Sequence, residues 1–310
     1  MKISHLRLTR LICSSIMVSM NRLDMEKRCQ IVSALVEGCS IRSTVRMTGA
    51  SKNTIAKLLA DLGQVCSDYQ DEVIRDLACK RLQCDEIWSF CYAKNKNVPE
   101  KMKGQKGVGD VWTWTALCPD TKLVPSWQVG ARDAATAYRF MSDLSERLAH
   151  RVQLTTDGNR VYLDAVENYF GCDIDYAMLI KHYGGAGDST KPETRYSPGN
   201  IVRTSSTTIM GNPDKEHVST SLVERQNLTM RMKMRRFTRL TNGFSKKIEN
   251  HCHAVSIHFM HYNFARIHQT IRCAPAMAAG VSRKLWSIKD IVGLLETREA
   301  KQGAANERDY

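Results

Sequence analysis

The chain has 310 residues, an ordinary apolar fraction of 43%, a formal net charge of +13 and a pI of about 9.3. This length suits one large domain with one or two small ones, and the charge favours a polyanionic partner such as nucleic acid. No apolar run reaches the roughly 18 to 20 residues that a membrane span needs, so we expect no membrane partner.

Residues 1–20 are basic and then apolar, but their apolar stretch is short and no small-residue cleavage site follows it. We interpret them as a disordered extension or as a reading frame that starts too early, with Met20 as an alternative start. The 11 cysteines include no C-x-x-C pair, which disfavours a zinc ribbon and indicates reduced thiols in a cytoplasmic protein.

Residues 21–64 carry the pattern of three short helices. Apolar spacing marks the first over 25–37, Ser40 can cap the second, and Ser51 can cap the third after a turn at Gly49. This order is typical of a helix-turn-helix, whose last helix reads DNA. The residues expected to contact DNA are Lys52, Asn53, Thr54 and Lys57. The alternative is a small helical packing module.

A linker helix is expected over 65–80, after which the pattern changes to period two. Strands are predicted in "LQCDEIWSFCYA", "DVWTWTALC", "KLVPSWQVG", "RVQLTTDG" and "YAMLIKHY", with helices over 133–149 and in "RVYLDAVENYF". This order predicts an α/β, ribonuclease H-like catalytic domain with a mixed five-stranded sheet over 81–282. The remaining expectations are a long loop insertion over 184–217, helices over 219–237 and 245–268, and a C-terminal helix and tail over 283–310.

Three carboxylates stand on separate predicted elements. Asp85 and Asp157 lie at or near the ends of two strands, and Glu224 begins a helix. Such groups can hold two divalent cations, Mg²⁺ or Mn²⁺, which activate the nucleophile and stabilise the leaving oxygen in phosphodiester transfer. We expect Asp85 to bridge the two metals. Glu86 is the alternative ligand, and because adjacent strand residues point to opposite faces, only one of the two is expected to serve the site.

A basic run without any acidic residue follows Glu224: Arg225, Arg231, Lys233, Arg235, Arg236, Arg239, Lys246 and Lys247. A solvated face normally mixes both signs, so this run favours phosphate binding, with Arg225, Lys233 and Arg235 among the expected DNA contacts. Arg231 lies two helical turns after Glu224 on the same face and is expected to grip a phosphate beside the scissile one. The histidines of "NHCHAVSIHFMHY" invite a zinc site, but ordinary helix surface is the favoured interpretation.

Four motifs, "DEIWSF", "TTDGN", "LVERQNLTMRM" and "HYNFARIHQTIRCAPAMAAGV", occur in this order and resemble transposases of the insertion sequence one family, which are DDE recombinases. The resemblance covers roughly residues 80–282. It implies metal-dependent hydrolysis at transposon ends and strand transfer into target DNA, with metal ligands at Asp85, Asp157 and Glu224 and a basic partner at Arg231.

The resemblance also implies terminal inverted repeats and target DNA as partners, a homo-oligomer that pairs two ends, and a nucleoid-associated bacterial protein. Tyr262, Asn263, Arg266 and His268 are expected to be structural. Many members carry a cysteine-rich zinc motif that this chain lacks, so end recognition is expected to rest on the helix-turn-helix. Two alternatives stay open: a catalytically inactive DNA-binding remnant, and a ribonuclease H-like nuclease of another type.

Overall fold

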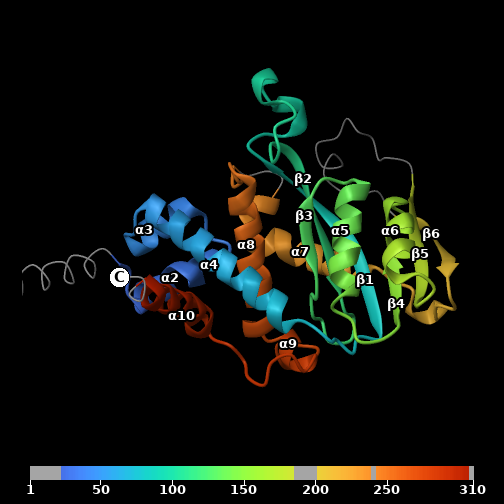
Figure 1. Ribbon diagram of the computed structural model, residues 1–310. Helices are drawn as coiled ribbons and strands as arrows, with labels where there is room; N and C mark the ends of the chain where they lie inside the picture. Colours follow the sequence, from blue (N-terminus) through green and yellow to red (C-terminus); the bar gives the residue numbers. More distant parts are fainter. Residues whose placement is uncertain (1–21, 185–200, 239–241, 307–310) are drawn as a thin grey trace, which may run out of the picture.

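A six-stranded mixed sheet forms the centre of the protein in the computed structural model, which describes residues 22–184, 201–238 and 242–306 (Figure 1). The strand order is β3-β2-β1-β4-β5-β6. Strands β1, β4 and β5 are parallel, whereas β2, β3 and β6 each pair antiparallel with a neighbour. The strands are β1 (Arg81–Cys91), β2 (Gly109–Leu117), β3 (Trp127–Gly130), β4 (Val152–Thr156), β5 (Ile174–Tyr183) and β6 (Ile201–Met210).

The prediction of an α/β fold with a mixed sheet is confirmed, but the sheet has six strands instead of five. The additional strand, β6, lies inside the segment predicted as a loop insertion, so that prediction is wrong for 201–210. Six of these ten residues are Ile, Val or Thr, whose branched side chains favour extended backbone. Residues 185–200 lie outside the described part of the chain.

Helices cover both faces of the sheet. On one face, α5 (Ala134–Ser145) and α6 (Val161–Phe170) enclose a core around Trp114, Phe140 and Tyr162. On the other, α7 (Ser221–Lys233) and α8 (Ile248–Met260) enclose a second core. The predicted helices over 219–237 and 245–268 are shorter in the structure. They end in a 3₁₀ turn at Arg235–Phe237 and a π turn at His261–Ala265.

The N-terminal module consists of α2 (Met25–Val36), α3 (Ile41–Thr48) and α4 (Lys52–Val73). Ser40 and Ser51 cap α3 and α4 as predicted, and Gly49 takes the left-handed conformation that ends α3. The prediction of a separate linker helix over 65–80 is wrong, because α4 continues without a break through Gly63 and ends at Val73.

At Gly63 two helices approach each other closely. A Cβ added at Gly63 would lie 2.4 Å from the Cβ of His253 on α8. The missing side chain therefore lets α4 pack directly against α8.

The C-terminal part returns to the N-terminal module. After α9 (Pro275–Ala278), the predicted C-terminal helix is present as α10 (Ile288–Asn306). It lies beside α2, where Arg28 donates to Glu299 over 2.9 Å (Figure 1). None of the helices in the described ranges is long and apolar enough to cross a bilayer.

Candidate metal centre

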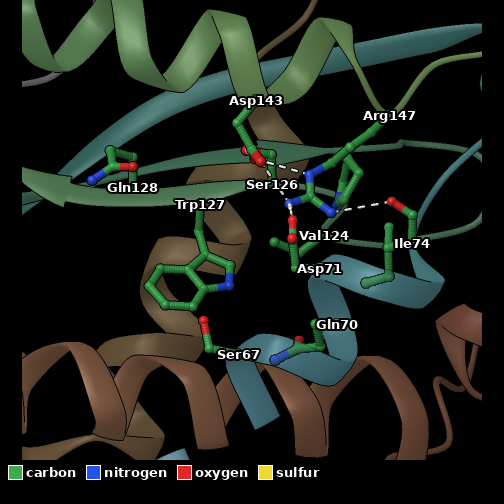
Figure 2. Close-up of a pocket in the computed structure, with 11 residues that line it drawn as sticks. Ser67, Gln70, Asp71, Ile74, Val124, Ser126, Trp127, Gln128, Asp143 and Arg147 are labelled. Atoms are coloured by element: carbon green, nitrogen blue, oxygen red, sulfur yellow. Dashed lines mark hydrogen bonds and ion pairs between the residues drawn. The ribbon is translucent and has the colours of Figure 1, made fainter. Parts of the chain in front are cut away.

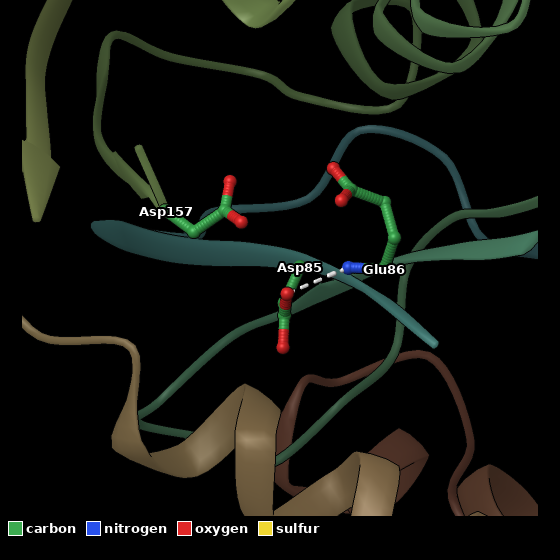
Figure 3. Close-up of side chains that lie close together, drawn as sticks. All are labelled: Asp85, Glu86 and Asp157. Atoms are coloured by element: carbon green, nitrogen blue, oxygen red, sulfur yellow. Dashed lines mark hydrogen bonds between the residues drawn. The ribbon is translucent and has the colours of Figure 1, made fainter. Parts of the chain in front are cut away.

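Three carboxylates meet on the central strands β1 and β4. One oxygen each from Asp85, Glu86 and Asp157 lies within 4.8 Å of the other two (Figure 3). The parallel pairing of β1 with β4 explains the meeting. Its last pair joins Cys84 to Thr156, so the residues that follow, Asp85 on β1 and Asp157 directly after β4, stand at the same level of the sheet.

Glu86 also belongs to this acidic cluster, so the structure brings both Asp85 and Glu86 near Asp157, whereas only one of the two was expected to serve the site. The two side chains do leave β1 on opposite sides, as Figure 3 shows. However, β4 ends at Thr156, so Asp157 lies just beyond the end of the strand. Its carboxylate is therefore near both Asp85 and Glu86.

Arg132 and Asn159 hold the side of the cluster that faces α6. Arg132 Nε donates to Glu86 over 3.1 Å, and its Nη2 lies 3.5 Å from Asp157. Asn159 Nδ2 donates to Glu86 over 3.3 Å. Because the Glu86 side chain is only 1% exposed, these donors compensate a buried charge. The Arg132 guanidinium also stacks 4.9 Å from the ring centre of Trp112.

The cluster concentrates negative charge. Burial, aided by the negative charges of Asp157 and Glu86, raises the pKa of Asp85 to about 7. Burial also raises the pKa of Glu86 and the pKa of Asp157, although Arg132 opposes both shifts. A cation would relieve this repulsion, and an all-oxygen donor set suits Mg²⁺ or Mn²⁺. The three side chains could therefore hold a metal ion.

Glu224, the third predicted ligand, lies beside the cluster but is not one of the three carboxylates that form it. It accepts from Thr220 Oγ1 over 2.7 Å and pairs with the ammonium of Lys181 on β5. Its negative charge nevertheless raises the pKa of Asp85 and of Asp157. Glu224 is thus close enough to interact electrostatically, with Lys181 as its salt-bridge partner.

Two polar contacts place α7 against β1. The side-chain oxygen of Gln83 accepts from the backbone N–H groups of Leu222 and Val223, over 3.0 and 3.1 Å. One turn later, Asn227 Nδ2 donates to Asp85 over 2.8 Å. The two bonds to Gln83 satisfy backbone N–H groups that a helix start leaves open. Together with the bond from Asn227, they direct the face bearing Glu224 towards the cluster.

The predicted basic run does not form one continuous surface. Arg225 and Arg235 are exposed, whereas Arg231 is half-buried two turns after Glu224 on the face of Asn227. Lys233 pairs with Glu37, and Arg236 donates to Ser245 while burial lowers its pKa to about 10. Arg239 lies outside the described residues.

The predicted DNA-reading residues stand at the start of α4. Lys52, Asn53 and Lys57 are exposed, Thr54 is half-buried, and Lys57 pairs with Asp61 over 2.6 Å. Figure 1 shows this end of α4 beside α3, with α8 between it and the sheet. The structure therefore does not bring these residues to the acidic cluster.

Sequence reasoning missed Arg132, Asn159, Lys181 and Asn227. Asn227 had a usable signal, because it follows Glu224 by three residues and so shares its helical face. Arg132 and Lys181 come from other elements, and nothing in their local pattern connects them with the acids.

A second concavity, of about 230 Å³, lies between α4, β3 and α5 (Figure 2). Arg147 crosses it and donates to Asp143 and Asp71, over 2.6 and 2.7 Å, and to the carbonyl of Ile74 over 3.1 Å. Since these polar groups pair with one another, we interpret this cavity as part of the packing contact between α4 and α5.

The interpretation of the histidine-rich segment as ordinary helix surface is wrong for His251 and His258, which are buried in the helical core. Burial lowers the pKa of each to about 3. Asn263 bonds both backbone groups of Val124, over 3.0 and 2.9 Å. Tyr262 donates to the carbonyl of Lys122 over 3.0 Å. These contacts give Tyr262 and Asn263 a structural role.

Neither protein-family models nor curated protein sequences give a significant match to this chain.

Proposed function

We propose that the chain is a DDE-type DNA transposase, which hydrolyses a phosphodiester at transposon ends and transfers the freed strand into target DNA. The observation that carries the proposal is the meeting of Asp85 and Asp157 on adjacent parallel strands, with Glu224 presented from α7. The mixed sheet with helices on both faces supports the proposal of a ribonuclease H-like core, to which β6 adds a sixth strand. The net charge of +13 supports a polyanionic substrate.

In this proposal Asp85 and Asp157 hold divalent cations and Glu224 completes the set. Bound Mg²⁺ or Mn²⁺ supplies an activated oxygen nucleophile and stabilises the leaving oxygen. Asn227 orients Asp85, and Arg132 holds Asp157 in place. Lys181 neutralises Glu224 and must release it before Glu224 can act as a ligand. In the same proposal, Arg225 and Arg231 of α7 bind DNA phosphates.

The N-terminal module supports the same proposal. Helices α3 and α4 are joined by a tight turn at Gly49, and the start of α4 exposes Lys52, Asn53 and Lys57. Such an arrangement suits docking into the major groove. We assign this module to recognition of the terminal repeats, in an oligomer that pairs two ends.

The proposal requires inverted repeats on either side of the gene, and a strand-transfer assay with those flanking sequences as substrate tests it. Asp157→Asn should abolish Mg²⁺-dependent cleavage and joining. The matched control, Asp164→Asn, changes an exposed acid on α6 and should leave both reactions intact. Full activity of Asp157→Asn would remove the metal-ligand assignment.

A ribonuclease H-like nuclease of another type is the second candidate, favoured by the place of Glu86 in the cluster. In that case Asp85, Glu86 and Asp157 would hold the cation and Glu224 would stay paired with Lys181. Cleavage of branched DNA without joining, insensitive to Glu224→Gln, would select this candidate.

A further inference from the structure

The connection between β1 and β2, residues 92–108, projects beyond the end of the sheet (Figure 1). We name it the basic arm. It contains one acidic residue, Glu100, and five lysines: Lys94, Lys96, Lys101, Lys103 and Lys106. Glu100 pairs with Lys103 over 2.6 Å. Within the described ranges, the exposed Lys96, Lys101 and Lys106 have no carboxylate at ion-pair distance.

The basic arm has a defined shape. Asn95 and Asp110 exchange two hydrogen bonds across its base, over 3.1 and 2.9 Å, and Val98 is buried. Tyr92 enters the arm with a φ of 66°, a left-handed conformation that costs free energy in a non-glycine residue. Its backbone N–H is held by the carbonyl of Ser245 over 2.8 Å. The lysines are therefore displayed on a fixed support.

A second, distant segment adds charge at the same place. The backbone of Ser245 forms an isolated parallel β-bridge with that of Cys91. A Cβ added at Gly107 would lie 2.5 Å from a methyl carbon of Ile248, so these two residues are also close together. The exposed Lys246 and Lys247 lie between these two contact points. Two parts of the chain thus gather seven lysines. The acids of the same region are Glu100, Asp110 and Glu249, of which the first two already have partners.

The chemistry of this surface indicates contact with phosphates. Lysine is a compact, strongly hydrated point charge, and 92–108 contains no arginine, whose planar fork is the more specific reader of phosphates and bases. Proteins that bind single strands offer aromatic rings for stacking. Here the rings of Trp88 and Phe90 lie beneath Lys94, 5.7 and 5.8 Å from its ammonium, and Tyr92 is the one exposed aromatic residue of the arm. One exposed ring does not make a platform for successive bases. A duplex bound through its backbone fits these features best.

We propose that the basic arm, with Lys246 and Lys247, binds the phosphate backbone of duplex DNA irrespective of sequence. This inference rests on the proposed function, in which target DNA is the substrate of unfixed sequence. The seven residues of β1 from Asp85 to Cys91 are separated by six steps, which span roughly 20 Å. A duplex with its scissile phosphate at the acidic cluster would thus reach the arm about six base pairs away.

The test measures how the affinity for a short duplex of random sequence depends on salt. The arm variant is the triple substitution Lys96→Gln, Lys101→Gln and Lys106→Gln. The control, Arg283→Gln, Lys289→Gln and Lys301→Gln, removes equal charge from exposed positions on and before α10. The arm variant should lower the slope of log affinity against log salt by about 2 to 3, and the control by less than about 1. In the unchanged protein, DNA should protect Lys101 and Lys106 from chemical acetylation.

The outcomes separate this inference from the proposed function. Suppose that the unchanged protein binds duplex DNA. If the arm variant then has the same salt slope, and if DNA leaves the arm lysines of the unchanged protein open to acetylation, the arm does not bind DNA. The transposase proposal would stay intact. An equal effect of the control variant, or tighter arm-dependent binding of duplex RNA, also overturns the role of the arm. Active Asp157→Asn protein counts against the transposase alone, whereas absence of any duplex binding counts against both.

Discussion

The side chain of Asn227 donates a 2.8 Å hydrogen bond to the carboxylate of Asp85, and so joins α7 to the strand that carries the acidic cluster. Hydrogen bonds to charged groups contribute about 1.5 to 3 kcal/mol, more than neutral ones. Because Glu224 precedes Asn227 by almost one helical turn, the same bond sets how Glu224 faces Asp85 and Asp157.

Replacing Asn227 by Leu should therefore lower both stability and the strand-transfer activity that we propose. We expect a loss of about 1.5 to 3 kcal/mol in the free energy of unfolding, measured with urea, together with weaker Mn²⁺ binding. Thr229→Ala is a suitable control, because Thr229 is on the same helix and bonds only the carbonyl of Arg225 among the contacts described. Unchanged Mn²⁺ affinity in Asn227→Leu would show that this bond does not position the ligands.

The raised pKa of Asp85 predicts how stability depends on pH in metal-free protein. Its folded-state pKa of about 7 lies above the ordinary value of 3.8, so the folded state binds the proton more tightly than the unfolded state. Its favourable contribution is thus complete below about pH 4 and is lost as the pH rises towards 7. Thermal unfolding in a chelator should show this decline, and Asp85→Asn should raise the Tm at about pH 8.

Added metal should reverse the decline, because a cation compensates the ionised carboxylates. We expect Mg²⁺ or Mn²⁺ to raise the Tm more at about pH 8 than at about pH 5, since protons compete with the metal for Asp85. Asp85→Asn should remove most of this gain, whereas the exposed Asp164→Asn should retain it. Equal gains at both pH values would argue against the cluster as the cation site.

The ion pair between Lys181 and Glu224 should compete with metal binding. Lys181→Gln removes the ammonium but keeps a polar side chain, so Mn²⁺ binding measured by calorimetry should tighten several-fold. Because the Glu224 side chain is 42% exposed, the free energy of unfolding should change by less than about 1 kcal/mol. In the Glu224→Gln background the same substitution should have no effect on Mn²⁺ affinity. A persistent gain there would mean that Lys181 acts on another ligand.

Local pattern predicted much of this fold and less of its site. Period-two runs identified the five strands up to Tyr183, and capping residues such as Ser40 and Ser51 marked helix starts. By contrast, the sequence did not predict β6, because a segment rich in Ser and Thr is also typical of a loop. Antiparallel pairing with β5 holds this segment as a strand. Likewise, Arg132 contacts Glu86, 46 residues earlier in the chain, and Asp157, 25 residues later, and only the folded sheet brings these three residues together.

Gly63 shows the same limit, since its role depends on a helix nearly two hundred residues later. Gly63→Ala should destabilise the protein, because the new Cβ would meet His253 at 2.4 Å and the neighbouring atoms include backbone. We expect a loss of about 1 to 3 kcal/mol in urea unfolding, despite the better helix propensity of alanine. Gly293→Ala, within α10 and with open space around the added carbon, should instead stabilise the protein by up to about 1 kcal/mol. If both variants gained stability, α4 and α8 would have to lie farther apart than described.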